Sequence, residues 1–163
     1  MPYQISLGHN EVALVDDSDF ADLNQYVWHV KIAPHGKYAA RTEYHNSKGV
    51  GVFKTIRMHS QLLGEKPGYL IDHISRNGLD NRRCNLRWVT KSQSCMNRVS
   101  KNWTLGHKGV CRCKNGAFRA RIQVLKRSIH LGYFDALHKA ISAYNDAALK
   151  LHGEFAVIND STN

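Results

Sequence analysis

The sequence has no apolar run approaching about twenty residues, the length that a helix needs to cross a bilayer. Its mean hydropathy is −0.45, and 42% of its residues are hydrophobic. The first residues, Met1 to Leu7, lack both the basic region and the long apolar region of a secretory signal. We therefore expect a cytoplasmic protein with a buried core that neither spans a membrane nor is secreted.

Acidic residues are absent from the middle of the chain. Residues 81–134 contain 13 Lys and Arg and no Asp or Glu, whereas the preceding 80 residues contain 8 basic and 9 acidic ones. The net charge of +10 therefore resides in the central third. A segment that cannot neutralise itself through local ion pairs presents a positive surface to a polyanion, and nucleic acid is the usual one. The alternative is a basic face that serves only solubility.

Closely spaced cysteine pairs are also absent. The four cysteines include no Cys-x-x-Cys pair, and Cys111 and Cys113 are two residues apart on a predicted strand. Structural zinc sites normally use closely spaced pairs, and without a secretory route disulfides are not expected. We therefore expect no structural zinc.

A length of 163 residues fits one large domain or two small ones. Residues 1–57 are predicted to form a small α+β scaffold. It has a strand over 12–15, a helix that begins at Asp17 and carries Phe20, Leu23 and Val27 on one face, and strands over 28–33, 38–44 and 50–57.

Residues 58–98 are predicted to contain a strand, a loop, a strand and a helix. A short helix over 58–63 ends at Gly64, and a strand over 69–73 precedes a polar loop. A second strand over 85–90 leads into Thr90-Lys-Ser-Gln93, which has the spacing of a capping box and starts a helix that runs to about residue 98. Asp72 and His73 then stand at the end of the first strand.

The same stretch resembles a known family. In order, it contains Ile-Asp-His (71–73), Gly-Leu-Asp-Asn-Arg-Arg (78–83) and Asn-Leu-Arg-Trp-Val-Thr (85–90). These elements resemble the HNH, or ββα-metal, nucleases, and especially the homing endonucleases of phages and introns. The resemblance implies an α+β fold whose ββα nuclease core spans residues 58–98, and a host-cell cytoplasm as the location if the protein is phage-encoded.

The resemblance also implies roles for three residues. His73 is the general base that takes a proton from the attacking water, since an imidazole titrates near neutral pH. Asp72 binds one divalent cation, with Mg²⁺ expected and Mn²⁺ the alternative. Asn85 holds the loop so that His73 keeps its orientation.

One position departs from the family pattern. The family usually carries an Asn or His in the first turn of the helix as the second metal ligand, and Ser94 stands there. Asn97 is three residues further on the same face, about 4.5 Å along the helix axis. Ser94 is thus a natural weakening, an inactivating substitution or a tolerated ligand. His59 also matches a family position, and either a functional or a packing role is open to it.

The C-terminal part is predicted to form a second unit. In Phe118–Val124, apolar residues alternate with Arg119, Arg121 and Gln123, which is the pattern of a half-buried strand with a cationic outer face. Strands over 110–114 and 128–133 flank it, and a helix with Asp135 as N-cap and Gly153 at its end follows. Its apolar stripe comprises Leu137, Ile141, Tyr144, Ala148 and Leu151.

Residues 108–159 resemble the AP2 DNA-binding domain, through Lys108-Gly-Val, Ile129-His-Leu-Gly-Tyr-Phe-Asp and the segment from Ala143 to Asn159. The resemblance implies a three-stranded antiparallel sheet, packed on one helix, that lies in the major groove. Residues 99–107 are then a basic linker. The expected contacts to base edges and phosphates are Arg112, Lys114, Arg119, Arg121, Gln123, Lys126 and Arg127, with Arg98 and Lys101 along the linker.

Together these features predict a site-specific endonuclease that cleaves double-stranded DNA with one divalent ion and leaves a 5′-phosphate and a 3′-hydroxyl. The alternative is a DNA-binding protein or regulator that keeps the fold but does not hold the metal because of Ser94. An RNA target is less favoured because the sheet offers Arg and Lys rather than aromatic side chains. The oligomeric state is open: a monomer suffices for nicking, whereas a double-strand break needs a dimer or two binding events.

Overall fold

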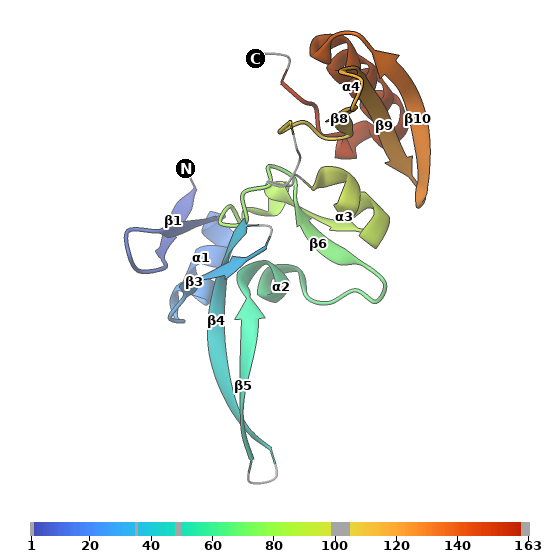
Figure 1. The fold of residues 1–163 in the computed structure, drawn as a ribbon. Coiled ribbons are helices and arrows are strands. Elements are labelled where there is room, and N and C mark those ends of the chain that lie inside the picture. The colour runs from blue at the N-terminus through green and yellow to red at the C-terminus, as the bar shows by residue number, and fades with distance from the viewer. Residues whose placement is uncertain (1, 35, 48–49, 99–104, 161–163) are drawn as a thin grey trace. The chain divides into compact units, whose positions relative to one another are not determined.

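The computed structural model describes residues 2–34, 36–47, 50–98 and 105–160 (Figure 1). It divides into two compact units, residues 1–90 and residues 91–163. Both combine short helices with small antiparallel sheets, which confirms the predicted α+β class. No helix in the described ranges is long and apolar enough to cross a membrane.

The first unit begins with a hairpin of β1 (Tyr3–Ser6) and β2 (Val12–Val15), followed by α1 (Asp17–Asn24). Asp17 and Asp19 in the first turn of α1 complement the positive end of the helix dipole. Helix α1 ends before Val27, which is 90% exposed, and the neighbouring Trp28 is buried instead. The prediction that Val27 continues the apolar face of this helix was therefore wrong.

A three-stranded antiparallel sheet follows, formed by β3 (His29–Ala33), β4 (Gly36–Ser47) and β5 (Val50–Arg57). Strand β3 pairs only with Gly36 to Ala40 of β4, whereas β5 pairs with β4 from Ala40 to Ser47. Beyond β3, the longer strands therefore continue as a two-stranded ribbon, which Figure 1 shows extending away from the rest of this unit. Helix α2 (Met58–Leu63) ends at Gly64, as predicted.

The core of this unit joins residues that are far apart in the sequence. Side chains from β1, β2, α1, β4 and α2 bury one another, among them Ile5, Val15, Leu23 and Met58. Leu79, from the loop that was predicted to be polar, packs against this cluster. The last elements are β6 (Leu70–His73), a short 3₁₀ turn (Arg83–Asn85) and β7 (Leu86–Val89), which pairs antiparallel with β6.

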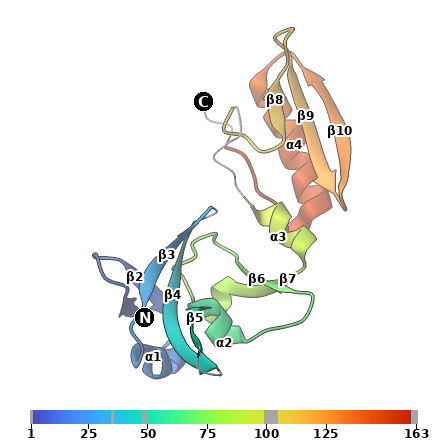
Figure 2. The same ribbon diagram turned by 60° about the horizontal axis from the view of Figure 1, so that its bottom comes forward.

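The second unit contains α3 (Lys91–Asn97), β8 (Val110–Arg112), β9 (Phe118–Val124), β10 (Arg127–Phe134) and α4 (Leu137–His152), with a 3₁₀ turn over Gly153–Phe155. The strands form an antiparallel sheet in the order β10-β9-β8. Figure 2 shows α4 running alongside these strands. Tyr144, Ile141 and Ala148 of the helix bury against Ile122 and Ala120 of the sheet.

Two details of α4 differ from the prediction. The N-cap is Ala136, whereas Asp135 forms an ion pair with Lys139 one helical turn away. Leu151 is 40% exposed, and His152 is the buried residue at this end of the helix. The stripe predicted from apolar residues alone was therefore wrong at its last position, because a histidine with a hydrogen bond to the carbonyl of Gln123 takes the inward place.

Candidate functional site

The hairpin of β6 and β7 places Asp72 and His73 at the end of one strand. Their side chains point to opposite faces because successive residues alternate along a strand. Asp72 lies opposite Arg87 in the register, and His73 lies opposite Leu86.

Asp72 forms an ion pair across the hairpin. The Nε and Nη2 atoms of Arg87 each lie 3.1 Å from Oδ2 of Asp72. Both side chains are largely buried, with 13% of each exposed. Arg87 therefore orients the carboxylate and offsets its charge, as a buried ion needs a partner close by.

His73 lies among polar and aromatic groups. It is 5% exposed, and its Nε2 lies 3.4 Å from Oδ1 of Asn81. The ring centroid of His59 is 5.1 Å away, nearly perpendicular, and that of Tyr38 is 5.9 Å away. These rings exclude water from most of the imidazole.

Burial sets the protonation of both histidines. Burial lowers the pKa of His73 below the usual value of 6.5, although the hydrogen bond with Asn81 and the charges of Asp72 and Asp80 act in the opposite direction. The pKa of His59 falls to about 3, chiefly because of burial and also through electrostatic interaction with His73 and Arg57. Both rings are therefore neutral near pH 7, and a neutral imidazole can accept a proton.

Asn85 holds the loop between the two strands. Its Oδ1 accepts a hydrogen bond of 2.8 Å from the backbone N–H of Ser75, and its Nδ2 donates one of 2.7 Å to the carbonyl of Asp80. Its own carbonyl accepts a third, of 2.9 Å, from the N–H of Ile74. One side chain thus ties together both ends of the segment that follows His73.

The loop is also docked on the N-terminal elements. The N–H of Asn81 donates to the carbonyl of Leu14 in β2, and the N–H of Leu14 donates to the carbonyl of Leu79. Arg83 binds both carboxylate oxygens of Asp19 in α1, at 2.8 and 2.7 Å. Residues 1–57 therefore fix the loop that carries Asn81.

The chemistry of Asp72 fits a hard cation. Mg²⁺ prefers oxygen ligands and is commonly held by one or two carboxylates together with waters and substrate phosphates. Within the described ranges, no three His, Cys, Asp or Glu side chains come together in a group that could hold a metal. An ion at Asp72 would therefore complete its shell with waters, substrate oxygens, or amide and hydroxyl donors.

The two other predicted metal ligands lie elsewhere in the chain. Ser94 and Asn97 are on α3, in the second compact unit, whereas Asp72, His73 and Asn85 are in the first. Asn97 is buried and Ser94 is half-buried. Their role as ligands stays a prediction.

The predicted DNA-contacting residues divide between different surfaces of the second unit. Arg119, Arg121 and Gln123 share the face of β9 opposite the core residues Ala120 and Ile122. Arg112 lies on the other face of the sheet, opposite Phe118 in the register, with its guanidinium 5.8 Å from that ring. Lys114 lies in the turn between β8 and β9, Lys126 lies in the turn between β9 and β10, and Arg127 is the first residue of β10. Arg98 follows α3, and Lys101 lies outside the described residues.

Sequence reasoning missed three residues around His73 or gave them no role. Asn81 belongs to the Gly-Leu-Asp-Asn-Arg-Arg motif, so the sequence could have indicated that it lies close to His73. His59 had been noted without a role, and its place beside His73 now gives it one as a packing partner. Tyr38 comes from a distant strand, and nothing in its local sequence points to the site.

Comparison with known proteins gives one family. A family model described as HNH endonuclease matches residues 60–95, a range that includes Asp72, His73, Asn85 and Ser94. Comparisons with curated proteins and with solved structures give no match. The matched range contains the docked hairpin with Asp72 and His73, and this part of the chain is similar to the HNH endonuclease family.

Proposed function

We propose that the chain is a site-specific, metal-dependent DNA endonuclease of the HNH type and that His73 is its general base. The observation that carries this proposal is the neutral, largely buried His73 beside Asp72, on a hairpin whose loop Asn85 ties at both ends. The family match over residues 60–95 supports the same assignment.

The tautomer of His73 follows from its neighbour. If Nε2 carries the proton, its N–H faces Oδ1 of Asn81, and the lone pair that accepts a proton is on Nδ1. Nδ1 would take a proton from water while the water oxygen attacks phosphorus. The bond between phosphorus and the 3′ oxygen breaks, which leaves a 5′-phosphate and, after protonation from solvent, a 3′-hydroxyl.

Asp72 would hold the divalent ion, Mg²⁺ in the first instance and Mn²⁺ as the alternative. When bound, the ion supplies positive charge that offsets the charge developing on the phosphate and on the departing oxygen. Arg87 keeps the carboxylate in one orientation through its two contacts to Oδ2. Ser94 or Asn97 would supply the second protein ligand.

The second unit would select the DNA site, as the AP2-like pattern suggests. Arg119, Arg121 and Gln123 on the outer face of β9 would read base edges, and Lys126 and Arg127 would bind phosphates. Phosphodiester cleavage requires only that the nuclease recognise the sugar-phosphate backbone of the DNA. A separate unit that recognises the bases would therefore restrict the sites at which the nuclease acts.

A second candidate is a DNA-binding protein that does not cleave. Two observations favour it: Ser94 is a poorer cation ligand than an amide, and Asp72 is already paired with Arg87. Both candidates predict salt-dependent DNA binding, so affinity alone does not separate them.

Cleavage of supercoiled DNA tests the proposal. The DNA carries a site that the protein is shown to bind, and it is incubated with Mg²⁺, with Mn²⁺ or with EDTA. The proteins are the natural chain, Ser94→Asn, and His73→Ala as the inactive control. We expect metal-dependent nicking or linearisation by the first two and none by His73→Ala.

Cleavage by Ser94→Asn alone would identify the natural chain as a disabled nuclease. Cleavage by neither protein, on DNA that both bind, would favour the DNA-binding candidate. Nicked product at every protein concentration would indicate a monomer acting on one strand, whereas linear product that rises steeply with concentration would indicate a dimer.

A further inference from the structure

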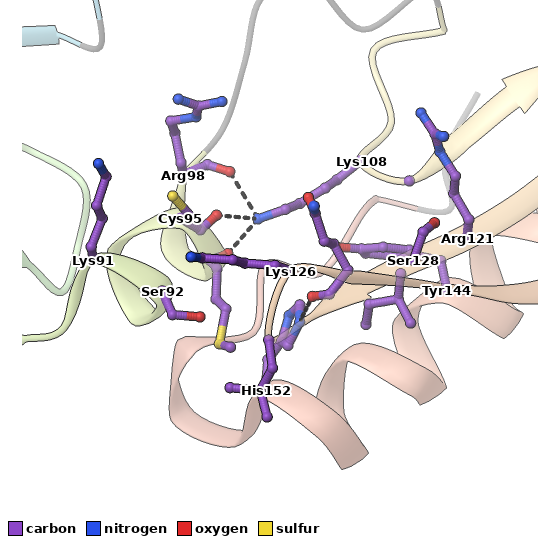
Figure 3. Close-up of a pocket in the computed structure, with 15 residues that line it drawn as sticks. Lys91, Ser92, Cys95, Arg98, Lys108, Arg121, Lys126, Ser128, Tyr144 and His152 are labelled. Atoms are coloured by element: carbon purple, nitrogen blue, oxygen red, sulfur yellow. Dashed lines mark hydrogen bonds between the residues drawn. The ribbon is translucent and has the colours of Figure 1, made fainter.

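A pocket of about 580 Å³ lies within the second unit (Figure 3). Its walls come from α3, from the end of β9 with the turn into β10, and from α4. A volume of this size is within the range of sites that bind small molecules.

The pocket is lined by five cationic side chains and by no carboxylate: Lys91, Arg98, Lys108, Arg121 and Lys126. The ammonium of Lys108 is engaged in the fold, because it donates to the carbonyls of Cys95, Met96 and Arg98 at the end of α3. Among the described residues, no carboxylate pairs with Lys91, Arg121 or Lys126. A phosphate is the biological anion that such a set suits.

The rest of the wall is mainly apolar. Met96 and Leu125 contribute accessible aliphatic surface, whereas Ile122 and Tyr144 lie behind them as core residues that are each 1% exposed. His152 also lines the pocket, and its buried Nδ1 has no hydrogen-bond partner in the part of the chain that the structure describes. A ligand that fits therefore combines an anionic group with a flat apolar body that carries polar atoms.

The turn between β9 and β10 has an unfavourable sequence for its conformation. Leu125 and Lys126 have φ angles of +46° and +66°, and they connect the paired residues Val124 and Arg127. A two-residue turn with positive φ at both positions favours Asn-Gly, because most other side chains are strained there. Leu125 is also 75% exposed, so it adds little to the core. Strain of this kind often marks a functional position.

We propose that this pocket binds a nucleoside phosphate: Lys91, Arg121 and Lys126 hold the phosphate, and Met96 and Leu125 contact the base. The proposal rests on the proposed nuclease function, which makes nucleic acid the natural source of such a group. The ligand is one nucleotide of a DNA strand or a free nucleotide, since both present the same chemistry.

Substitutions in the turn between β9 and β10 give the most specific test of the proposed binding. The double substitution Leu125→Asn with Lys126→Gly supplies the preferred turn sequence and removes both proposed contacts. We expect it to fold at least as stably as the natural chain and to bind the ligand at least about tenfold more weakly, as the loss of one charged contact and one apolar contact predicts. Lys126→Glu tests the charge alone, and Lys150→Ala, an exposed lysine of α4 outside the pocket, is the matched control.

Four probes distinguish the ligand sources. They are deoxyadenosine monophosphate, deoxyadenosine, inorganic phosphate and a short single-stranded oligodeoxynucleotide. Each is titrated into the ¹⁵N-labelled full chain, and shifts of the amide signals of Gly109, Gln123 and Lys126 report binding. The expected result is saturable binding of the monophosphate, the oligonucleotide or both, with weaker binding of phosphate and of deoxyadenosine.

Binding of the monophosphate would identify a site for free nucleotides, whereas binding of the oligonucleotide alone would identify a site for a strand. The proposal is overturned if neither shifts these signals, if inorganic phosphate binds as tightly as the monophosphate, or if the turn variant binds like Lys150→Ala. DNA cleavage by the natural chain and by Ser94→Asn is measured in parallel. Ligand binding without cleavage by either the natural chain or Ser94→Asn would reject the nuclease and keep the pocket. Cleavage without ligand binding would do the reverse.

Discussion

At position 73, an imidazole is surrounded by groups that carry no positive charge at neutral pH: the ring of Tyr38, the neutral ring of His59 and the amide of Asn81. Their burial of the ring lowers the pKa of His73, which favours its proton-accepting form near pH 7. The same burial makes the folded state sensitive to acid, because protonating either histidine requires a charge in a dry environment.

Acid sensitivity is the first prediction. The pKa of His59 is about 3 in the folded state and about 6.5 when unfolded, so the unfolded state binds more protons between these values. The free energy of unfolding should therefore fall as the pH drops below 6.5, by up to about 1.4 kcal/mol per pH unit for this one group. Urea unfolding at several pH values measures the slope.

His59→Gln should flatten this slope, and His29→Gln, at an exposed histidine of β3, should leave it unchanged. An identical slope in the His59 variant would show that this ring does not titrate in the way its burial predicts.

Asn85 provides the second prediction. Asn85→Ala removes two side-chain hydrogen bonds and leaves the N–H of Ser75 and the carbonyl of Asp80 without these partners. Unpaired polar groups in partly buried positions cost about 1 to 3 kcal/mol each. For the two groups together we expect a loss of about 2 to 6 kcal/mol of unfolding free energy, measured in urea, together with a strong loss of cleavage.

Asn77→Ala is the comparison, because Asn77 is an exposed residue of the same loop that bonds one backbone N–H. Equal losses in both variants would mean that Asn85 is an ordinary loop residue.

Among the secondary structure elements, the strands were largely predictable and the docking of the loop was not. The alternating pattern of Phe118–Val124 and the capping sequence at Thr90 specify local structure, and β9 and α3 lie where these signals place them. The loop after His73 depends on Leu14, Asp19 and Tyr38, which are distant in sequence and carry no local signal. β1 was missed because its four residues form a strand only through pairing with β2.

Gly78 tests the docking of that loop. A Cβ atom at this position would lie 2.3 Å from the carbonyl oxygen of Lys37 and 2.7 Å from the ring of Tyr38. Gly78→Ala should therefore destabilise the first unit by roughly 1 to 3 kcal/mol, as other overpacked sites do. Thermal unfolding followed by circular dichroism measures the effect.

The matched variant is Gly78→Ala combined with Tyr38→Ala. It should not restore stability, because the shorter contact is with backbone that no side-chain substitution removes. Full recovery in the double variant would place the conflict at the ring instead.

At the scale of the whole molecule, there are two separate hydrophobic cores, one formed by residues that precede position 90 and one by residues that follow it. One contains Leu23, Trp28 and Met58, and the other contains Ile122, Ile141 and Tyr144. Neither core shares a residue with the other, so each unit has its own source of stability.

Independent stability of the two units is the fourth prediction. Leu23→Ala and Ile141→Ala each remove a buried aliphatic side chain, which costs about 2 to 5 kcal/mol. Amide hydrogen exchange should show faster opening only in residues 1–90 for the first variant and only in residues 91–163 for the second. Each variant is the control for the other, and acceleration throughout the chain in both would indicate one cooperative unit.

The docking of the loop on β2 and α1 has a consequence for how such proteins diversify. A recombination event that transferred only residues 58–98 would separate Asn81 from Leu14 and Arg83 from Asp19. His73 would then be transferred without the residues of β2 and α1 that hold its loop in place. Lineages that exchange residues 58–98 should therefore carry the first 57 residues along with them.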